Sequence, residues 1–188
     1  MIKIRNGVFE TNSSSVHSLV IKKSGHRQIE DEVLKNIYLT KNGVYNIYDY
    51  DVYFDRAPFR ILFTAIEKFL YLYAESNDEK RIELMEFMKT TFPKIKEYKF
   101  PSVYNDEYEP FYGEVDHQSK GFVSNYLKTN NIDFKEFILN TKYNIIIDGD
   151  EYGEWEKIKE SGLINLAEIE IDVNPFNSEI KTYEDETE

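Results

Sequence analysis

Three short polar segments contain the residue types and spacings that could support chemistry. The first is the run Thr11-Asn12-Ser13-Ser14-Ser15, which is followed closely by His17. Small hydroxyl side chains leave the backbone accessible and add O–H donors to its N–H donors, which suits phosphate or carboxylate oxygens. We therefore expect the run to hold an anionic group. The ligand-binding candidates are Arg5, Asn12, Ser13 and Ser15, and the catalytic candidates are Ser14 and His17.

The same run is also typical of a turn between two strands, in which hydroxyl side chains bond to the nearby backbone. A nucleophilic role for Ser14 finds no support in the spacing, because the run lacks the Gly-x-Ser-x-Gly pattern of a nucleophile elbow. The residues therefore leave two interpretations open, a structural turn and an anion site.

The second segment is Asp116-His117-Gln118-Ser119, directly before an expected helix. Histidine titrates near neutrality and can act as a base, an acid or a ligand, and a neighbouring carboxylate can orient it. Asp116 and His117 are catalytic candidates, and Ser119 is a ligand-binding candidate. In the alternative, Asp116 or Ser119 caps the helix and His117 makes only structural hydrogen bonds.

The third segment is Asp148-Gly149-Asp150, at the end of an apolar run. Carboxylates at the C-terminal end of a strand are well placed to hold Mg²⁺ or Mn²⁺, because hard cations prefer oxygen ligands. Asp148 and Asp150 are the metal-binding candidates, and a divalent cation such as Mg²⁺ is the cofactor they would bind. Asp-Gly is also a turn signal by itself, and the segment is too short for a calcium-binding loop.

The formal charge of −12 is distributed unevenly along the 188 residues. Residues 1–27 carry a net charge of +4, whereas residues 148–188 carry −11. The basic front contains the hydroxyl run and favours an anionic ligand, while the acidic end would suit a basic protein surface. Direct nucleic-acid binding ranks third, because +4 is a weak electrostatic footprint beside the whole-chain charge.

The composition also limits the compartment and the class of chemistry. The chain has no cysteine, which excludes a disulfide scaffold, a thiol nucleophile and a cysteine-ligated metal centre. Met1 leads into polar residues without the apolar segment of a secretion signal. The longest apolar stretch, 57–74, is interrupted by charged residues, which argues against a membrane span. We expect a cytoplasmic protein of a bacterial host cell.

The elements that must position these segments are a mixture of strands and helices. Hydrophobic periodicity predicts strands at 2–5, 16–22, 143–147 and 167–173. Periodicity and capping residues predict helices at 58–76, 78–92, 119–128, 133–140 and 151–160. Residues 94–115 are expected to form short strands and loops. Pro58 is expected to open the first helix, and Pro93 to close the second. The aromatic and acidic run 45–54 fits either a strand or an irregular loop packed by its tyrosines.

These elements predict an α+β fold with a mixed or antiparallel sheet and an αα-hairpin, at about 58–92, packed on it. The length and the 41% apolar content suit one hydrophobic core, so residues 1–176 are expected to form a single domain. Residues 177–188 are acidic and poor in apolar side chains, and we expect this tail to fray.

The run Phe-Glu-Thr-Asn-Ser-Ser-Ser-Val-His-Ser, residues 9–18, resembles the N-terminal signature of a group of uncharacterised proteins of phages and their low-GC bacterial hosts. The match covers residues 5–18, and the Asp-His-Gln-Ser segment at 116–119 is a shorter echo of a second motif. The resemblance implies a phage or prophage setting, and it implies no particular reaction. Because both signatures consist of polar residues instead of core residues, the resemblance gives a site the same weight as a turn.

Two functions follow from these patterns. In the first, the chain binds a phosphate-bearing small molecule such as a nucleotide, and hydrolyses or transfers it, with His17 and His117 as acid and base and Asp116 orienting them. In the second, it is a non-enzymatic acidic protein that inhibits a host or defence protein, using 148–188 and the tyrosine-rich stretch 45–55. The first function requires the hydroxyl run, His17 and Asp116 to meet in one pocket.

Overall fold

The computed structural model has the α+β fold that the sequence predicts. The residues that it describes are 2–3, 16–22, 24–55, 60–102, 110–116, 119–148, 169–173 and 182–183. Side chains are described for these residues except those of β1, β9 and β10, Val16, Ser18 and Asp148.

An antiparallel four-stranded sheet with the strand order β5-β8-β2-β9 forms one side of the molecule. Its strands are β5 (Arg60–Leu62), β8 (Tyr143–Asp148), β2 (Val16–Lys22) and β9 (Ile169–Val173). The predicted strands 16–22 and 143–147 are the inner pair, and the apolar run 145–147 is buried, which confirms a central strand. The register places His17, Ile147 and Arg60 in one row across β2, β8 and β5.

The helices pack mainly against one another and against this sheet. They are α1 (Glu30–Leu34), α2 (Asp49–Val52), α3 (Ala65–Glu75), α4 (Asp78–Thr91), α5 (Phe122–Thr129) and α6 (Phe134–Leu139). The predicted αα-hairpin is present as α3 and α4, with the side chain of Asn77 capping α4. Nearly all of α3 is buried, so it forms the centre of the core. None of the described helices is long and apolar enough to cross a membrane.

The first helix begins later than predicted, and Pro58 does not open it. Residues 60–62 instead form β5, which pairs with β8. Thr64 and Glu67 form a capping box, in which the Thr64 hydroxyl accepts from Glu67 N (3.2 Å) and Glu67 Oε2 accepts from Thr64 N (3.0 Å). Because this box satisfies backbone N–H groups at the start of α3, the helix begins at Ala65. The residues before it are therefore free to form β5 and to pair with β8.

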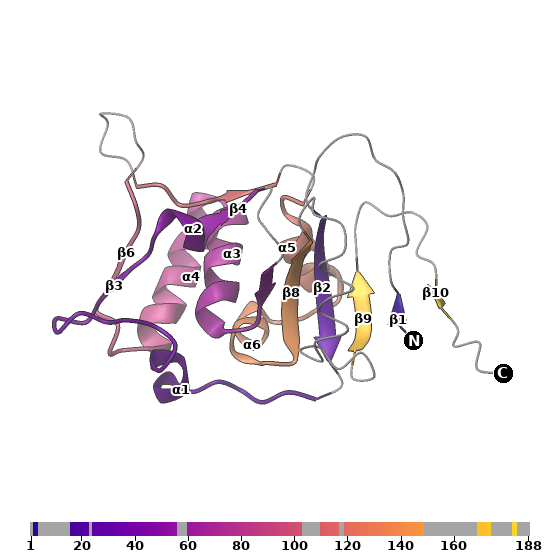
Figure 1. Cartoon of the computed structure of the whole chain (residues 1–188), viewed down its shortest axis with the longest axis horizontal. Coiled ribbons are helices and arrows are strands. Elements are labelled where there is room, and N and C mark those ends of the chain that lie inside the picture. The colour runs from indigo at the N-terminus through magenta and orange to yellow at the C-terminus, as the bar shows by residue number, and fades with distance from the viewer. Residues whose placement is uncertain are drawn as a thin grey trace.

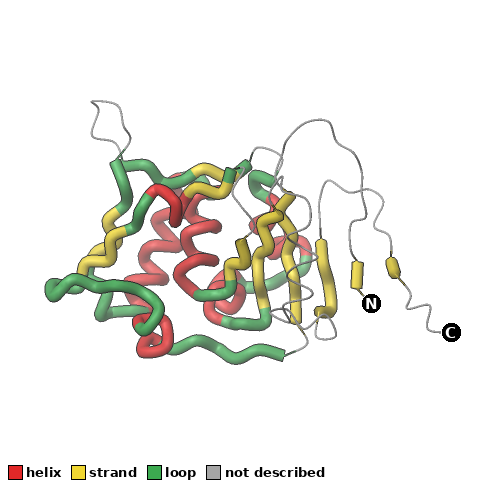
Figure 2. Tube along the Cα trace, viewed as in Figure 1, coloured by secondary structure: helices red, strands yellow, loops and turns green. Residues whose placement is uncertain are grey.

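Three short strand pairs complete the fold. The parallel pairs are β3 (Val44–Asn46) with β6 (Glu97–Lys99) and β4 (Tyr53–Phe54) with β7 (Glu114–Val115), and the antiparallel pair is β1 (Ile2–Lys3) with β10 (Thr182–Tyr183). The run 45–54 therefore contains both strand and helix. Figure 1 shows the β3–β6 pair, the helices α3 and α4, and the four-stranded sheet in that order from left to right. Figure 2 shows the same separation between β3–β6 and the larger sheet.

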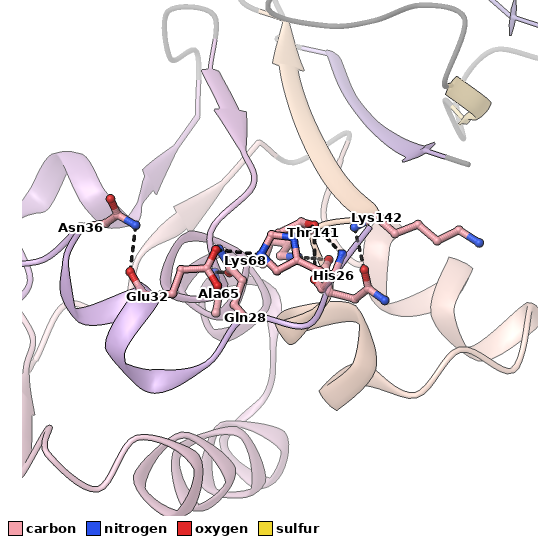
Figure 3. Close-up of polar contacts among 9 residues, drawn as sticks. His26, Gln28, Glu32, Asn36, Ala65, Lys68, Thr141 and Lys142 are labelled. Carbon is pink, nitrogen blue, oxygen red and sulfur yellow. Dashed lines mark hydrogen bonds and ion pairs between the residues drawn. The ribbon is translucent and has the colours of Figure 1, made fainter. Parts of the chain in front are cut away.

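A cluster of polar contacts ties the segment after β2 to the turn before β8 (Figure 3). The backbone N–H of His26 donates to Thr141 Oγ1 (3.0 Å), and His26 Nε2 lies 2.8 Å from Glu32 Oε1 on α1. Lys68 is buried on α3, and its Nζ donates to the carbonyls of Asn140 (2.7 Å) and Tyr143 (3.1 Å). Burial lowers the pKa of Lys68 to about 7. These contacts hold the end of α6 against α3, which is a structural role.

Gly113 is predicted to be essential for the packing of β7 on α2 and α3. Its φ is +105°, and a Cβ there would lie 2.6 Å from the Val52 carbonyl oxygen and 2.8 Å from Ala74 Cβ. Gly121 also has a positive φ, +77°, but a Cβ there meets nothing closer than 3.7 Å. Urea unfolding should therefore show a loss of about 3 kcal/mol or more for Gly113→Ala and about 1 kcal/mol for Gly121→Ala. Equal losses would contradict the packing argument.

Candidate functional site

The described part of the candidate site is centred on Tyr71 of α3. His17 of β2 is fully buried, and its Nδ1 lies 2.8 Å from the Tyr71 hydroxyl oxygen. Burial raises the pKa of Tyr71 well above its ordinary value, and the carboxylates of Glu75 and Asp116 add to that effect. Asp116, which follows β7, is itself buried. Two candidates predicted from distant parts of the sequence, His17 and Asp116, therefore converge on one phenol.

Glu75 lies one helical turn after Tyr71 on α3, and its carboxylate caps the N-terminus of a different helix, α5. Its Oε1 accepts from the backbone N–H of Ser124 (2.9 Å) and from the Ser124 hydroxyl, while Gly121, the N-cap residue, has no side chain to do so. Burial raises the pKa of Glu75 to about 7, although the hydrogen bonds from Ser124 and neighbouring N–H groups of α5 oppose this. Its Oε2 is buried without a hydrogen-bond partner within the described residues.

The predicted cap at Asp116 or Ser119 is therefore wrong. The helix begins at Phe122, three residues later than expected, and Glu75 from another element satisfies its first N–H groups. Asp116 and Ser119 are both buried, and Ser119 N donates to the Asp116 carbonyl (2.9 Å). The Asp116 carboxylate acts electrostatically on Tyr71.

His17 is a neutral imidazole at neutral pH. Burial lowers the pKa of His17 from 6.5 to about 4, against smaller raising effects of the nearby Phe54 carbonyl and the Asp55 carboxylate. Tyr71 keeps its proton, and its hydroxyl either donates to Nδ1 or accepts from it, depending on the tautomer of His17. Nε2 is buried and makes no hydrogen bond within the part of the chain that the structure describes. The neutral, buried ring of His17 is therefore suited to hold Tyr71 in position.

Arg60 adds a positive charge to the same end of the sheet. It lies in the cross-strand row of His17 and Ile147, so its backbone is about 10 Å from that of His17 at ordinary strand spacing. Its guanidinium is half-buried, lies 5.3 Å from the centre of the Phe54 ring, and donates from Nη1 to the Tyr50 carbonyl (2.8 Å). The remaining N–H groups of the guanidinium form no hydrogen bond that the described residues record.

The other predicted site residues are placed only in part. Asp148 ends β8, and its backbone opposes Val16, the residue that follows Ser15 in the chain. The candidates outside the described residues are Arg5, Asn12, Ser13, Ser14, Ser15, His117 and Asp150. Within the described residues, no three histidine or acidic side chains are grouped to hold a metal ion. A Mg²⁺ site at Asp148 and Asp150 therefore stays a prediction.

Sequence patterns did not identify Tyr71, Glu75 or Arg60 as site residues. Both Tyr71 and Arg60 fall within the predicted helix 58–76, and the structure places Arg60 in the strand β5 instead. One signal was present, because a tyrosine and a glutamate four residues apart on a buried helix face need polar partners. The identity of those partners, His17 and Ser124, depends on contacts between distant segments.

Comparison with known proteins gives no relative for this chain. No family model matches it, and no curated protein and no solved structure is significantly similar to it. The resemblance of residues 5–18 to phage proteins therefore stays a prediction, and the chemistry of the site rests on its own residues.

His17 and Glu75 are predicted to give the free energy of unfolding opposite pH dependences. The folded-state pKa of His17, about 4, lies below 6.5, so the contribution of His17 is present above pH 6.5 and is lost as the pH falls to 4. The folded-state pKa of Glu75, about 7, lies above 4.5, so its contribution is present below pH 4.5 and is lost as the pH rises to 7. Each difference between the folded-state and the unfolded-state pKa corresponds to about 3 kcal/mol in the free energy of unfolding.

The two effects should nearly cancel in the wild type between pH 4.5 and 6.5. As the pH falls through this interval, Glu75→Gln should lose stability because only the His17 effect remains, and His17→Gln should gain stability. Urea unfolding at a series of pH values measures these slopes, with Glu79→Gln, an exposed glutamate on α4, as the matched control. Parallel slopes for the two buried-site variants would show that neither group titrates as described.

Proposed function

We propose that this protein binds a phosphate-bearing small molecule, such as a nucleotide, at the end of the four-stranded sheet where β2 begins and β8 ends. The observation that carries the proposal is the convergence of His17 and Asp116 on Tyr71, since these two residues belong to the two polar signatures of the sequence. Polar side chains that meet from such distant positions are typical of a site.

Arg60 supplies the positive charge that such a ligand needs. A guanidinium has five N–H donors in a planar fork that fits two phosphate oxygens, and only one bond, to Tyr50, is recorded within the described residues. Two carboxylates, Glu67 and Asp51, act on Arg60 directly, and the polar cluster around Tyr71 adds less negative charge than its carboxylates suggest. His17 is neutral, and the pKa of Glu75 near 7 leaves that carboxyl partly protonated at neutral pH.

The hydroxyl run lies outside the described residues, and its last residue directly precedes the start of β2 in the chain. Ser15 is bonded to Val16, whose Cα pairs with that of Asp148 at the end of β8. Val16 is in turn the neighbour of His17 in the chain. The proposal therefore assigns the ligand's phosphate to Arg60 together with the backbone and hydroxyl donors of residues 12–15.

Hydrolysis or transfer of the phosphate forms a second, separate part of the proposal. His17 is buried and its Nδ1 is occupied by Tyr71, so we assign it a positioning role. The reacting groups would then be Ser14 and His117, with Asp116 orienting the histidine. Product analysis after incubation with each ligand tests this part independently of binding.

A thermal-shift assay with inorganic phosphate and a panel of nucleotides, with and without Mg²⁺, is the direct test of binding. A ligand at about 100 times its Kd should raise the melting temperature by about 5–10 °C. Arg60→Gln should abolish most of this increase, because it removes the cation without removing the side chain's stem. Arg27→Gln, which changes an exposed arginine outside the site, should retain the full increase.

Two outcomes would contradict the proposal. One is a wild-type melting temperature that no phosphate-bearing ligand changes. The other is an Arg60→Gln protein that keeps a wild-type circular dichroism spectrum and still responds fully to the ligand. An increase that requires Mg²⁺ and disappears in Asp148→Asn would support the predicted metal ligands as well.

A further inference from the structure

An open groove of about 700 Å³ lies beside β3 and β6, away from the polar cluster around Tyr71. It is formed by the segments 46–50 and 99–102, which leave these two strands in parallel. In Figure 1 the strands β3 and β6 lie across α3 and α4 from the four-stranded sheet, whereas α2, which begins at Asp49, lies near the ends of these two helices. Aromatic and apolar side chains line much of it, among them Ile47, Tyr48, Tyr50, Phe100 and Pro101.

Two exposed tyrosines form one wall of the groove. The rings of Tyr48 and Tyr50 are stacked, with centroids 5.6 Å apart and planes within 4° of parallel. Their side chains are 54% and 68% exposed. A tyrosine can bury about 150–250 Å² of surface when a partner covers it, so this pair leaves a large area available for binding. Adjacent exposed aromatic side chains of this kind are typical of binding surfaces, where tyrosine is enriched among the residues that dominate affinity.

The backbone that carries the two tyrosines is fixed on several sides. Tyr48 N donates to Asp51 Oδ2 (2.9 Å), and the Tyr50 carbonyl accepts from Arg60 Nη1 (2.8 Å). Ile47 N donates to the Lys99 carbonyl (2.9 Å), which joins the two walls of the groove. A partner would therefore bind to a surface that is already ordered, and ordering it would cost little.

The charge around the tyrosines favours a cationic ligand. The stretch 45–55 contains Asp49, Asp51 and Asp55 and no lysine or arginine, and Arg60 adds one positive charge to it through the bond to the Tyr50 carbonyl. Lys99 is the one basic residue among those described as lining the groove, and Asp49 lines it as well. This balance disfavours a nucleic acid or a nucleotide at this place and favours a basic protein segment.

Arginine fits the groove better than lysine does. A planar guanidinium can stack on a tyrosine ring while it pairs with a carboxylate, whereas an ammonium group is a strongly hydrated point charge. The protein uses this chemistry internally, since the guanidinium carbon of Arg81 lies 4.9 Å from the ring centre of Tyr112 and that of Arg60 lies 5.3 Å from the ring centre of Phe54. Tyr48 and Tyr50 offer the same kind of ring face to solvent.

We propose that the groove formed by 46–50 and 99–102 binds an extended, arginine-containing segment of a partner protein, with a guanidinium on the Tyr48–Tyr50 pair and near the Asp49 carboxylate. This interaction uses other side chains than the proposed phosphate-binding site, although Arg60 of that site bonds to the Tyr50 carbonyl. The partner is thus a protein with an exposed basic segment, and the tyrosine-rich stretch is the surface that recognises it.

Nuclear magnetic resonance titration of the isotope-labelled full chain with a short synthetic peptide containing two arginines is the test. Chemical-shift changes should be confined to residues 46–50 and 99–102 and their neighbours. The peptide with lysines in place of the arginines should bind several-fold more weakly, and the peptide with glutamates should not bind.

Single substitutions separate this surface from a general charge effect. Tyr48→Ala and Tyr50→Ala should each weaken binding by about tenfold, and Asp49→Asn should weaken it by a smaller factor. Lys99→Glu should strengthen binding because it removes the opposing charge. Tyr38→Ala is the matched control, since Tyr38 is 80% exposed and lies outside the groove. Tyr48→Ala should also leave any nucleotide-induced increase in melting temperature unchanged.

Any one of four results would overturn the proposal. The first is a set of peptide-induced chemical-shift changes that lies elsewhere on the protein, or that is equal for the arginine and glutamate peptides. The second is a wild-type protein whose chemical shifts do not change with millimolar arginine peptide. The third is a loss of peptide affinity in Tyr38→Ala that equals the loss in Tyr48→Ala. The fourth is a nucleotide that binds in the groove in preference to the arginine peptide, because the surface would then belong to another ligand.

Discussion

The hydrogen bond between His17 Nδ1 and the Tyr71 hydroxyl joins the four-stranded sheet to the most buried helix of the protein. Both side chains are fully buried, and a buried polar atom without a partner costs about 1–3 kcal/mol. The bond therefore favours one register of β2 and one rotation of α3, because a slip of one residue in the strand would turn His17 to the other face. The positions of Asp116, Arg60 and the strand ends around them depend on that register.

Helix α3 extends the same principle to its other neighbours. Its polar side chains at positions 68, 71 and 75 follow helical spacing on a helix that is otherwise almost entirely apolar and buried. Lys68 bonds to the carbonyls at the end of α6, Tyr71 bonds to β2, and Glu75 caps the start of α5. Each side chain satisfies backbone or side-chain groups that would otherwise be buried without partners. Residues of the candidate site are thus also residues that hold the fold together.

Arg60 connects the two surfaces that we assign to ligands. Its backbone belongs to the row that contains His17, and its guanidinium bonds to the backbone of Tyr50 under the exposed tyrosine pair. The two surfaces nevertheless have different chemistry. The sheet end has a half-buried cation beside buried polar side chains, whereas the groove has aromatic faces and the Asp49 carboxylate. We accordingly propose a phosphate for the first surface and an arginine side chain for the second.

The sequence by itself determined the features that depend on neighbouring residues: the strand 16–22, the apolar central strand, the αα-hairpin and the α+β class. It placed the start of the first long helix wrongly, because β5 exists only through its pairing with β8, more than 80 residues later. It did not identify Tyr71 or Glu75, because their partners, His17 and Ser124, are 54 and 49 residues away. Periodicity and capping act within a few residues and can be recognised in one segment, whereas burial of a polar atom beside its partner is decided only when distant segments pack together.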